Sequence, residues 1–156
     1  MKRSTKILIT VAIILVAIQF IRPAKNQGSV YAATDVTHVI NTSEEVKQIL
    51  ATSCNDCHSN HTTYPWYNNI QPVAGWLGHH IDEGKGELNL TEFANYPVKK
   101  QIHKLEETAE MVREGEMPLN SYLWVHGDAK LSPEQKELLA KWAEDGMRQL
   151  SAIAPN

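Results

Sequence analysis

Apolar residues recur every three or four positions along most of the chain beyond residue 41, the spacing of one face of an α-helix. The first such segment runs through Val46, Ile49 and Leu50 and leads into Cys54. Thr42, with a glutamate three residues later, has the pattern of a capping box. We therefore expect a helix that begins at Thr42 and delivers Cys54 at its end.

Three further segments have the same period. Residues 73–88 form an amphipathic stretch weakened by glycines, and residues 97–115 begin with Pro97, which suits a first helical position, and end at Gly115. The last segment opens at Ser132-Pro133 and is expected to stop near Gly146. No stretch alternates long enough to indicate a strand, so the pattern predicts a small all-α domain with long loops.

The N-terminus has a different pattern. Three basic residues within the first six precede the apolar run 7–21, which predicts an export signal or a membrane anchor over residues 1–25. Fifteen helical residues cover about 22 Å, less than the roughly 30 Å hydrocarbon core, which favours a cleaved signal. Small residues suited to cleavage occur only at 30–33, well beyond the run, which favours a retained anchor. Both possibilities stay open.

Residues 26–41 show no sustained period and are expected to be a linker, so that residues 42–150 form the domain. The chain of 156 residues allows one domain of this kind. Its first 25 residues hold five of the 15 basic residues and no acidic one, which leaves a net charge of −8 on the remainder. That charge argues against nucleic acid as a partner. The basic N-terminus predicts a location on the periplasmic side of the inner membrane, or free in the periplasm.

The chemistry centres on "CNDCH" at residues 54–58, which contains both cysteines of the chain. Two thiols three residues apart can reach the two vinyl groups at one edge of a haem, and the following His58 can bind the iron. Cys54, Cys57 and His58 therefore predict covalent attachment of one haem c. We expect the second nitrogen of His58 to donate to a backbone carbonyl near Pro65 or Pro72.

Two other interpretations of the cysteines, a zinc site and a thiol redox pair, lack the sequence features that they require. A zinc site would need two more ligands at suitable spacing, and His58 and His61 are too close together to form the usual histidine pair. A thiol redox pair should follow a strand at the start of a helix, whereas this motif follows a predicted helix. An exported thiol pair also tends to form a disulfide unless haem captures it.

The second axial ligand of the iron is predicted to be Met117. It lies between Gly115 and Pro118, in the loop that joins the last two predicted helices, whereas Met111 is predicted inside a helix and Met147 lies near the chain end. His80 and His126 are the alternative ligands. The block of aromatic residues after the haem motif, together with Trp76, is expected either to line a haem crevice or to belong to the core.

The sequence resembles two families. The motif 54–58, the dipeptide Met117-Pro118 and a C-terminal helix opening "LSPEQKELLAKW" are similar to class I c-type cytochromes. "CNDCHSNHTTYPWY", "GEMPLNSY" and "IQFIRP" resemble more closely the haem-binding domain family of small exported bacterial proteins, over about residues 7–145. That resemblance implies haem binding without establishing a reaction. The aromatic block and the 58 residues between His58 and Met117 depart from ordinary class I cytochromes.

A cytochrome c-like helical domain with His58 and Met117 on a single haem predicts a one-electron carrier between redox partner proteins, because both axial positions are filled. The alternatives are a haem peroxidase or a peroxidase-associated domain, and a haem-based sensor. No catalytic arginine and histidine pair is identifiable in the sequence, so an enzyme is disfavoured.

Overall fold

The computed structural model describes residues 2–29 and 32–153, and the described residues form helices and loops without a named strand. The all-helical prediction is confirmed. The α-helices are α1 (Arg3–Ile18), α2 (Val36–Val39), α3 (Glu44–Ser53), α4 (Asn55–His58), α5 (Val73–Glu87), α6 (Val98–Glu114), α7 (Asn120–Leu123) and α8 (Pro133–Ile153). Three short 3-10 helices join them: η1 (Trp66–Asn69), η2 (Leu90–Asn95) and η3 (Gly127–Ala129).

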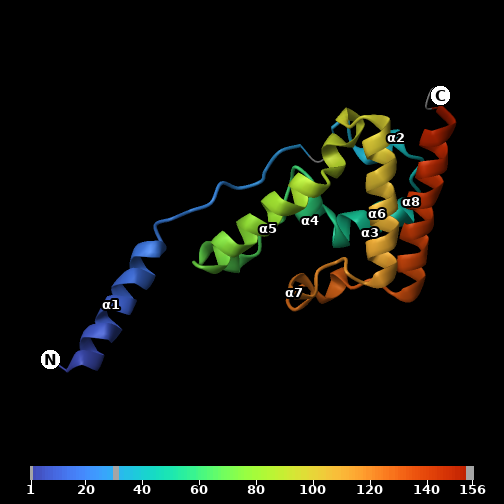
Figure 1. Cartoon of the computed structure of the whole chain (residues 1–156). Coiled ribbons are helices and arrows are strands. Elements are labelled where there is room, and N and C mark those ends of the chain that lie inside the picture. Colours follow the sequence, from blue (N-terminus) through green and yellow to red (C-terminus); the bar gives the residue numbers. More distant parts are fainter. Residues whose placement is uncertain (1, 30–31, 154–156) are drawn as a thin grey trace.

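Helices α6 and α8 run side by side and form the long edge of the domain (Figure 1). Gly115 ends α6 in the left-handed conformation at φ 77°, as its position predicted. The predicted stop of α8 near Gly146 is wrong, because the helix continues to Ile153. Gly146 is buried where a Cβ would approach side-chain atoms of Ile40 and Leu105 to 3.0 Å, so this glycine permits close packing instead of ending the helix.

The start of α3 also differs slightly from the prediction. Ser43 caps the helix by accepting a hydrogen bond from the amide of Val46 at 3.3 Å. Thr42 does not cap it; its hydroxyl donates to the carbonyl of Ile40 and accepts from the indole of Trp142 at 3.0 Å. Thr42 therefore connects the segment just before α3 to α8 across 100 residues of sequence.

Much of the expected linker is packed into the domain. Val36 and Ile40 are 1% and 2% exposed and belong to the main apolar core, and Asp35 caps α2 by accepting from the amide of Thr37. Nearer the N-terminus, Asn26 donates its amide to the Tyr64 hydroxyl at 2.7 Å. The segment has no sustained helical period because α2 contains only four residues, and the residues before it contact loops of the domain.

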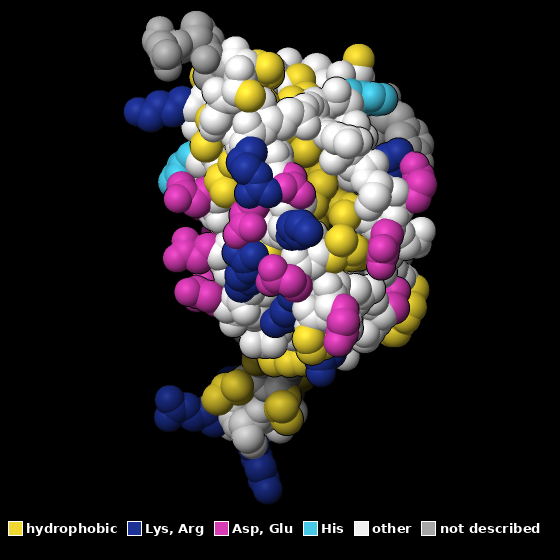
Figure 2. All heavy atoms as spheres, turned by 90° about the vertical axis from the view of Figure 1, so that its right-hand side faces the viewer, with side chains coloured by type: hydrophobic (Ala, Val, Ile, Leu, Met, Phe, Trp, Pro, Cys, Tyr) yellow, Lys and Arg dark blue, Asp and Glu magenta, His cyan; other side chains and the backbone are white. Residues whose placement is uncertain are grey.

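Helix α1 has no buried residue and extends away from the rest of the structure (Figure 1). Among the described residues, no helix reaches the combined length and apolar character required to cross a membrane. On the face that carries α8, basic and acidic side chains alternate over the surface (Figure 2). Arg113 of α6 pairs there with Glu137 and Glu144 of α8.

Candidate functional site

The "CNDCH" motif occupies a sharp break between two helices. Helix α3 ends at Ser53, Cys54 leaves the helical conformation at φ −125°, and α4 begins at Asn55. The amides of Cys57 and His58 both donate to the carbonyl of Cys54, at 3.2 and 2.9 Å. One short turn therefore holds both thiols and the histidine, as the spacing predicted.

A cavity of about 420 Å³ opens beside this turn. That volume lies within the range of roughly 300–1,000 Å³ usual for cofactor pockets. The structure brings Cys54, Cys57, His58 and Met117 together on its wall. Apolar side chains from several regions of the chain form much of the remaining lining: Leu50, Leu88, Leu90, Leu105, Val112, Leu119, Leu131 and Trp142. A large, mostly apolar ligand fits such a lining.

The two thiols are partly buried and are not joined to each other. Burial, reinforced by the neighbouring Cys57, raises the pKa of Cys54 to about 12. Burial and the charge of Asp56 raise the pKa of Cys57 to about 11. Redox-active cysteines need a lowered pKa, so the surroundings of this pair do not suit thiol exchange. Within residues 2–29 and 32–153, no group of three or more His, Cys, Asp or Glu side chains could hold a metal ion.

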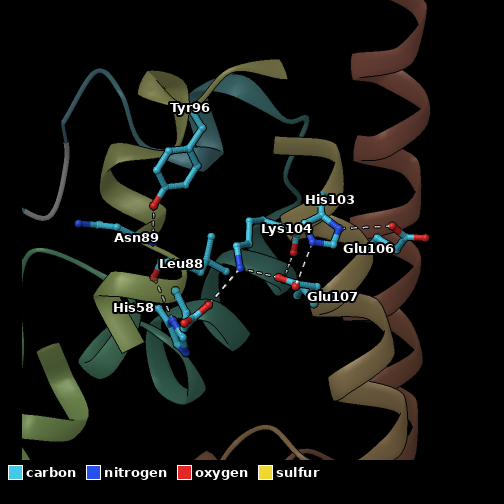
Figure 3. A network of polar contacts seen from close by, with 10 residues as sticks. His58, Leu88, Asn89, Tyr96, His103, Lys104, Glu106 and Glu107 are labelled. Atoms are coloured by element: carbon cyan, nitrogen blue, oxygen red, sulfur yellow. Dashed lines mark hydrogen bonds and ion pairs between the residues drawn. The ribbon is translucent and has the colours of Figure 1, made fainter. Parts of the chain in front are cut away.

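His58 is oriented by the end of α5. Its Nδ1 lies 3.0 Å from the carbonyl of Leu88, and Figure 3 shows the ring directed at this atom. The expected partner near Pro65 or Pro72 is therefore wrong. Burial lowers the pKa of His58, against the opposing effect of the Leu88 carbonyl. A neutral imidazole that donates from Nδ1 keeps the Nε2 lone pair available to bind a metal.

Helix α5 approaches the motif more closely at Gly84 than any side chain would allow. A Cβ built there would lie 2.8 Å from the carbonyl oxygen of Cys57 and 3.1 Å from its Cβ. Gly84 also accepts the hydrogen bond from the Leu88 amide that ends the helix. The same helix end therefore packs against Cys57 and positions the carbonyl that orients His58.

Met117 reaches the cavity from the loop between α6 and α7. Its amide donates to the carbonyl of Met111 at 3.2 Å, next to the left-handed turn at Gly115. Tyr122 of α7 lines the same cavity and donates to Asp56 Oδ2 at 2.8 Å. Since Asp56 lies in α4, this bond ties α7, and with it the end of the Met117 loop, to the "CNDCH" motif. Sequence reasoning missed Tyr122, because the bond joins residues 66 positions apart.

The alternative ligands differ in position. His80 lines the cavity with its Nδ1 3.0 Å from the carbonyl of Trp76, and Met111 lines it too. His126 is not part of the lining; its ring stacks on Tyr122 at 4.0 Å and its Nε2 lies 3.3 Å from the Tyr67 hydroxyl. The aromatic residues expected at the crevice do not line the cavity either, and Trp66 is 76% exposed.

A charged group borders the cavity on the α6 side. Lys104, with only 12% of its side chain exposed, lies 2.7 Å from Glu107 and 3.3 Å from Glu87 (Figure 3). The hydrogen bond to Glu107 raises the pKa of Lys104 against the effect of burial. Sequence reasoning did not select Lys104, although a glutamate three residues further along a helix is a detectable pairing signal.

Comparison with known proteins gives one match. A family model described as a haem-binding domain matches residues 13–145. These residues include both cysteines, His58, Met117 and the lining of the cavity. Searches of curated proteins and of solved structures return no match.

Proposed function

Since the chain belongs to the haem-binding domain family, and therefore binds haem, we propose that it holds a single haem c and carries one electron at a time between protein partners. The observation that carries this proposal is the meeting of Cys54, Cys57, His58 and Met117 on the wall of one apolar cavity. The residues fit the group, because the cavity supplies two thiols, an oriented imidazole and a thioether.

Cys54 and Cys57 would form the two thioether bonds, and His58 and Met117 would be the axial ligands. Bound haem supplies a one-electron iron couple. The Leu88 carbonyl holds the ring of His58 in one tautomer, and the Tyr122–Asp56 hydrogen bond holds the Met117 loop against α4. Lys104 lines the cavity with its ammonium group paired to Glu87 and Glu107.

The chain's apolar side chains contribute by excluding water from the site. Leu105 and Leu131 are 2% and 7% exposed, and both line the cavity. A dry surrounding and a soft thioether ligand both favour the reduced, less charged iron and so raise the reduction potential. Filled axial positions leave no site for a substrate, which favours a carrier over a peroxidase or a sensor.

We propose further that the domain is exported and remains attached to the periplasmic side of the inner membrane through the N-terminal segment that contains α1. Because α1 alone is too short to cross the bilayer, the side chains of Lys6 and Arg22 would have to extend to the two membrane surfaces. The support comes from the sequence, in which Lys2, Arg3 and Lys6 precede an apolar helix. The redox partners would then meet the domain in the periplasm. Its net charge of −8 beyond residue 25 would suit a basic partner surface.

Optical spectra of the purified full chain test the ligand set. We expect the oxidised protein to show the weak far-red sulfur-to-iron band and the reduced protein not to bind carbon monoxide. Met117→Ala should abolish the band, lower the potential and admit carbon monoxide, because water or a histidine replaces the thioether. Met111→Ala is the matched control, since Met111 lines the same cavity and should leave the band intact.

The outcomes separate the alternatives. A wild-type protein that lacks the band and excludes carbon monoxide would point to a second histidine ligand, and His80 would be the first to replace because it lines the cavity. A wild-type protein that binds carbon monoxide rapidly would contradict the carrier proposal and favour the peroxidase or sensor.

A further inference from the structure

Helix α1 presents apolar side chains to the surroundings on every side. Ile7, Leu8 and Val16 are 56%, 69% and 63% exposed, and the helix has no buried residue. Apolar side chains on all sides of a helix require an apolar surrounding. The rest of the described chain does not provide it, because α1 extends away from the domain (Figure 1).

The C-terminal end of α1 is nevertheless fixed to the domain. Gln19 and Gln71 exchange two hydrogen bonds, one from the Gln19 side chain to the Gln71 carbonyl at 3.2 Å and one from the Gln71 amide back to the side chain at 3.0 Å. The Gln71 side chain donates to the carbonyl of Ile21 at 2.8 Å, and Arg22 donates to the carbonyl of Asn69 at 2.5 Å. Residues 19–22 therefore leave α1 along η1 and the start of α5.

Four apolar side chains are exposed around this attachment. Trp66, Ile70, Val73 and Trp76 are 76%, 46%, 37% and 46% exposed, and we call them the exit face. Ile70 lies between the two residues that bind the exit segment, and Val73 and Trp76 stand three positions apart on one side of α5.

We propose that the exit face lies in the interfacial region of the lipid bilayer that holds α1. The inference rests on the anchoring part of the proposed function. Continuity is the main argument, because the residues that follow an embedded helix must emerge at the bilayer surface, and the hydrogen bonds of Gln19 and Arg22 hold the exit face beside that point.

The chemistry of the exit face supports a lipid partner. Tryptophan is enriched at membrane interfaces because its indole has an apolar body and one polar N–H group. Arg22, which donates to the carbonyl of Asn69, adds positive charge beside the face, which suits lipid phosphates. Phe20 and Ile21, 84% and 64% exposed, add apolar surface to the segment that joins α1 to the domain.

This placement would orient the haem site. Helix α5 starts at the exit face and ends at Leu88, whose carbonyl orients His58. Fifteen residues at 1.5 Å each separate the two ends by about 22 Å. The bilayer would then contact one end of α5, and the haem ligand would lie beyond the other end.

The test uses the four tryptophans of the full chain as reporters. The protein is labelled with 5-fluorotryptophan, inserted into lipid nanodiscs and reduced, and its fluorine NMR signals are assigned by single Trp→Phe replacements. Relaxation is compared between discs with and without a gadolinium-chelating lipid headgroup. We expect several-fold larger enhancement at Trp66 and Trp76 than at Trp124, which is 82% exposed outside the exit face, and at Trp142, which is 6% exposed.

Each outcome decides a separate point. Protein that elutes apart from the discs would refute the anchoring and this inference together, whereas the haem spectrum of the same sample would still test the carrier proposal. Protein that stays in the discs, with Trp66 and Trp76 enhanced no more than Trp124, would refute the exit face alone. That result would leave a second copy or a redox partner as the occupant of the surface.

Discussion

The interiors of the two halves of the domain, one around α3, α6 and α8 and the other around α4, α5 and α7, are filled in different ways. Around α3, α6 and α8, protein side chains fill the interior: Leu105, Leu139 and Leu150 are at most 2% exposed. Around α4, α5 and α7 the wall includes shorter pieces, and neither α4 nor α7, with four residues each, contains a fully buried residue. These pieces meet at the cavity, and the cavity lies between the two halves.

The difference indicates what each half needs in order to be stable. Helices of four residues do not form on their own, because nucleating a helical turn costs more than its few hydrogen bonds return. The α6–α8 half has its own large core, whereas the α4–α5–α7 half buries only the apolar residues Ala74, Leu77 and Ile81 of α5 and would gain a larger apolar centre from haem. The following predictions test that contrast, from the largest expected effect to the smallest.

The double replacement Cys54→Ala and Cys57→Ala should remove haem altogether and affect the two halves unequally. We expect no haem stain after denaturing electrophoresis, and a loss of amide protection in α5 and α7 while α6 and α8 stay protected. Hydrogen exchange measured by mass spectrometry checks this. Ser53→Ala, at another residue of the cavity wall, is the control and should keep the stain. Equal loss of protection in both halves would remove the contrast.

Gly84→Ala should separate α5 from the haem motif. The added methyl would lie 2.8 Å from a backbone oxygen of Cys57, which cannot rotate away, so we expect a loss of about 1–3 kcal/mol from overpacking. Gly86→Ala is the matched control in the same helix, because no atom lies within 4 Å of its Cβ position. It should stabilise the protein by about 0.8 kcal/mol. Urea unfolding followed by haem absorbance compares the two, and equal midpoints would contradict the prediction.

Tyr122→Phe should loosen the Met117 loop without emptying the cavity. It removes the 2.8 Å hydrogen bond to Asp56, and we expect a loss on the order of 1 kcal/mol together with slow carbon monoxide binding by reduced protein. Tyr67→Phe removes the longer 3.3 Å contact with His126 and serves as the comparison. If both variants exclude carbon monoxide as wild type does, the Tyr122 bond does not hold the loop.

Arg113→Gln should have the smallest effect, because the ion pairs of Arg113 with Glu137 and Glu144 are exposed and add to a half that is already packed. Its hydrogen bonds lower the pKa of both carboxyl groups. A lowered pKa in the folded state means that the stabilisation is present above the ordinary carboxyl pKa and is lost as the pH falls through the lowered value. The melting temperatures of variant and wild type should therefore differ slightly at pH 7 and converge in acid or at high salt.

The sequence predicted the parts of the fold that depend on local pattern. The apolar period and Gly115 placed α6 within a residue at each end, and residues 73–88 matched α5. The sequence failed where tertiary packing determines the structure. Helix α8 continues through Gly146 because that glycine is buried against Ile40. Helix α2 was assigned to a linker, although Val36 belongs to the core. Neither contact leaves a periodic signal.

The site divides in the same way. Cys54, Cys57 and His58 could be predicted because one helical turn contains all three. Met117 could be predicted because it lies in the loop that joins the last two predicted helices. The Leu88 carbonyl and Tyr122 could not be, since each acts through a partner distant in sequence. Composition and spacing show which residue types lie near one another along the chain. The roles of these residues depend instead on neighbours that only the folded structure brings close.

The hydrogen bonds of residues 19–28 also bear on what a cut in the chain would do. Besides the contacts at Gln19 and Arg22, Asn26 bonds to Tyr64, Ser59 and Thr62, and Gly28 donates to the carbonyl of Asn60 at 2.6 Å. Cleavage at residues 30–33 would turn this segment into a separate peptide ligand. Its contacts would then depend on the free peptide concentration instead of the high effective concentration that the intact chain provides. An intact chain keeps the loop after His58 supported at any dilution, and a cut chain would lose that support as the peptide diffuses away.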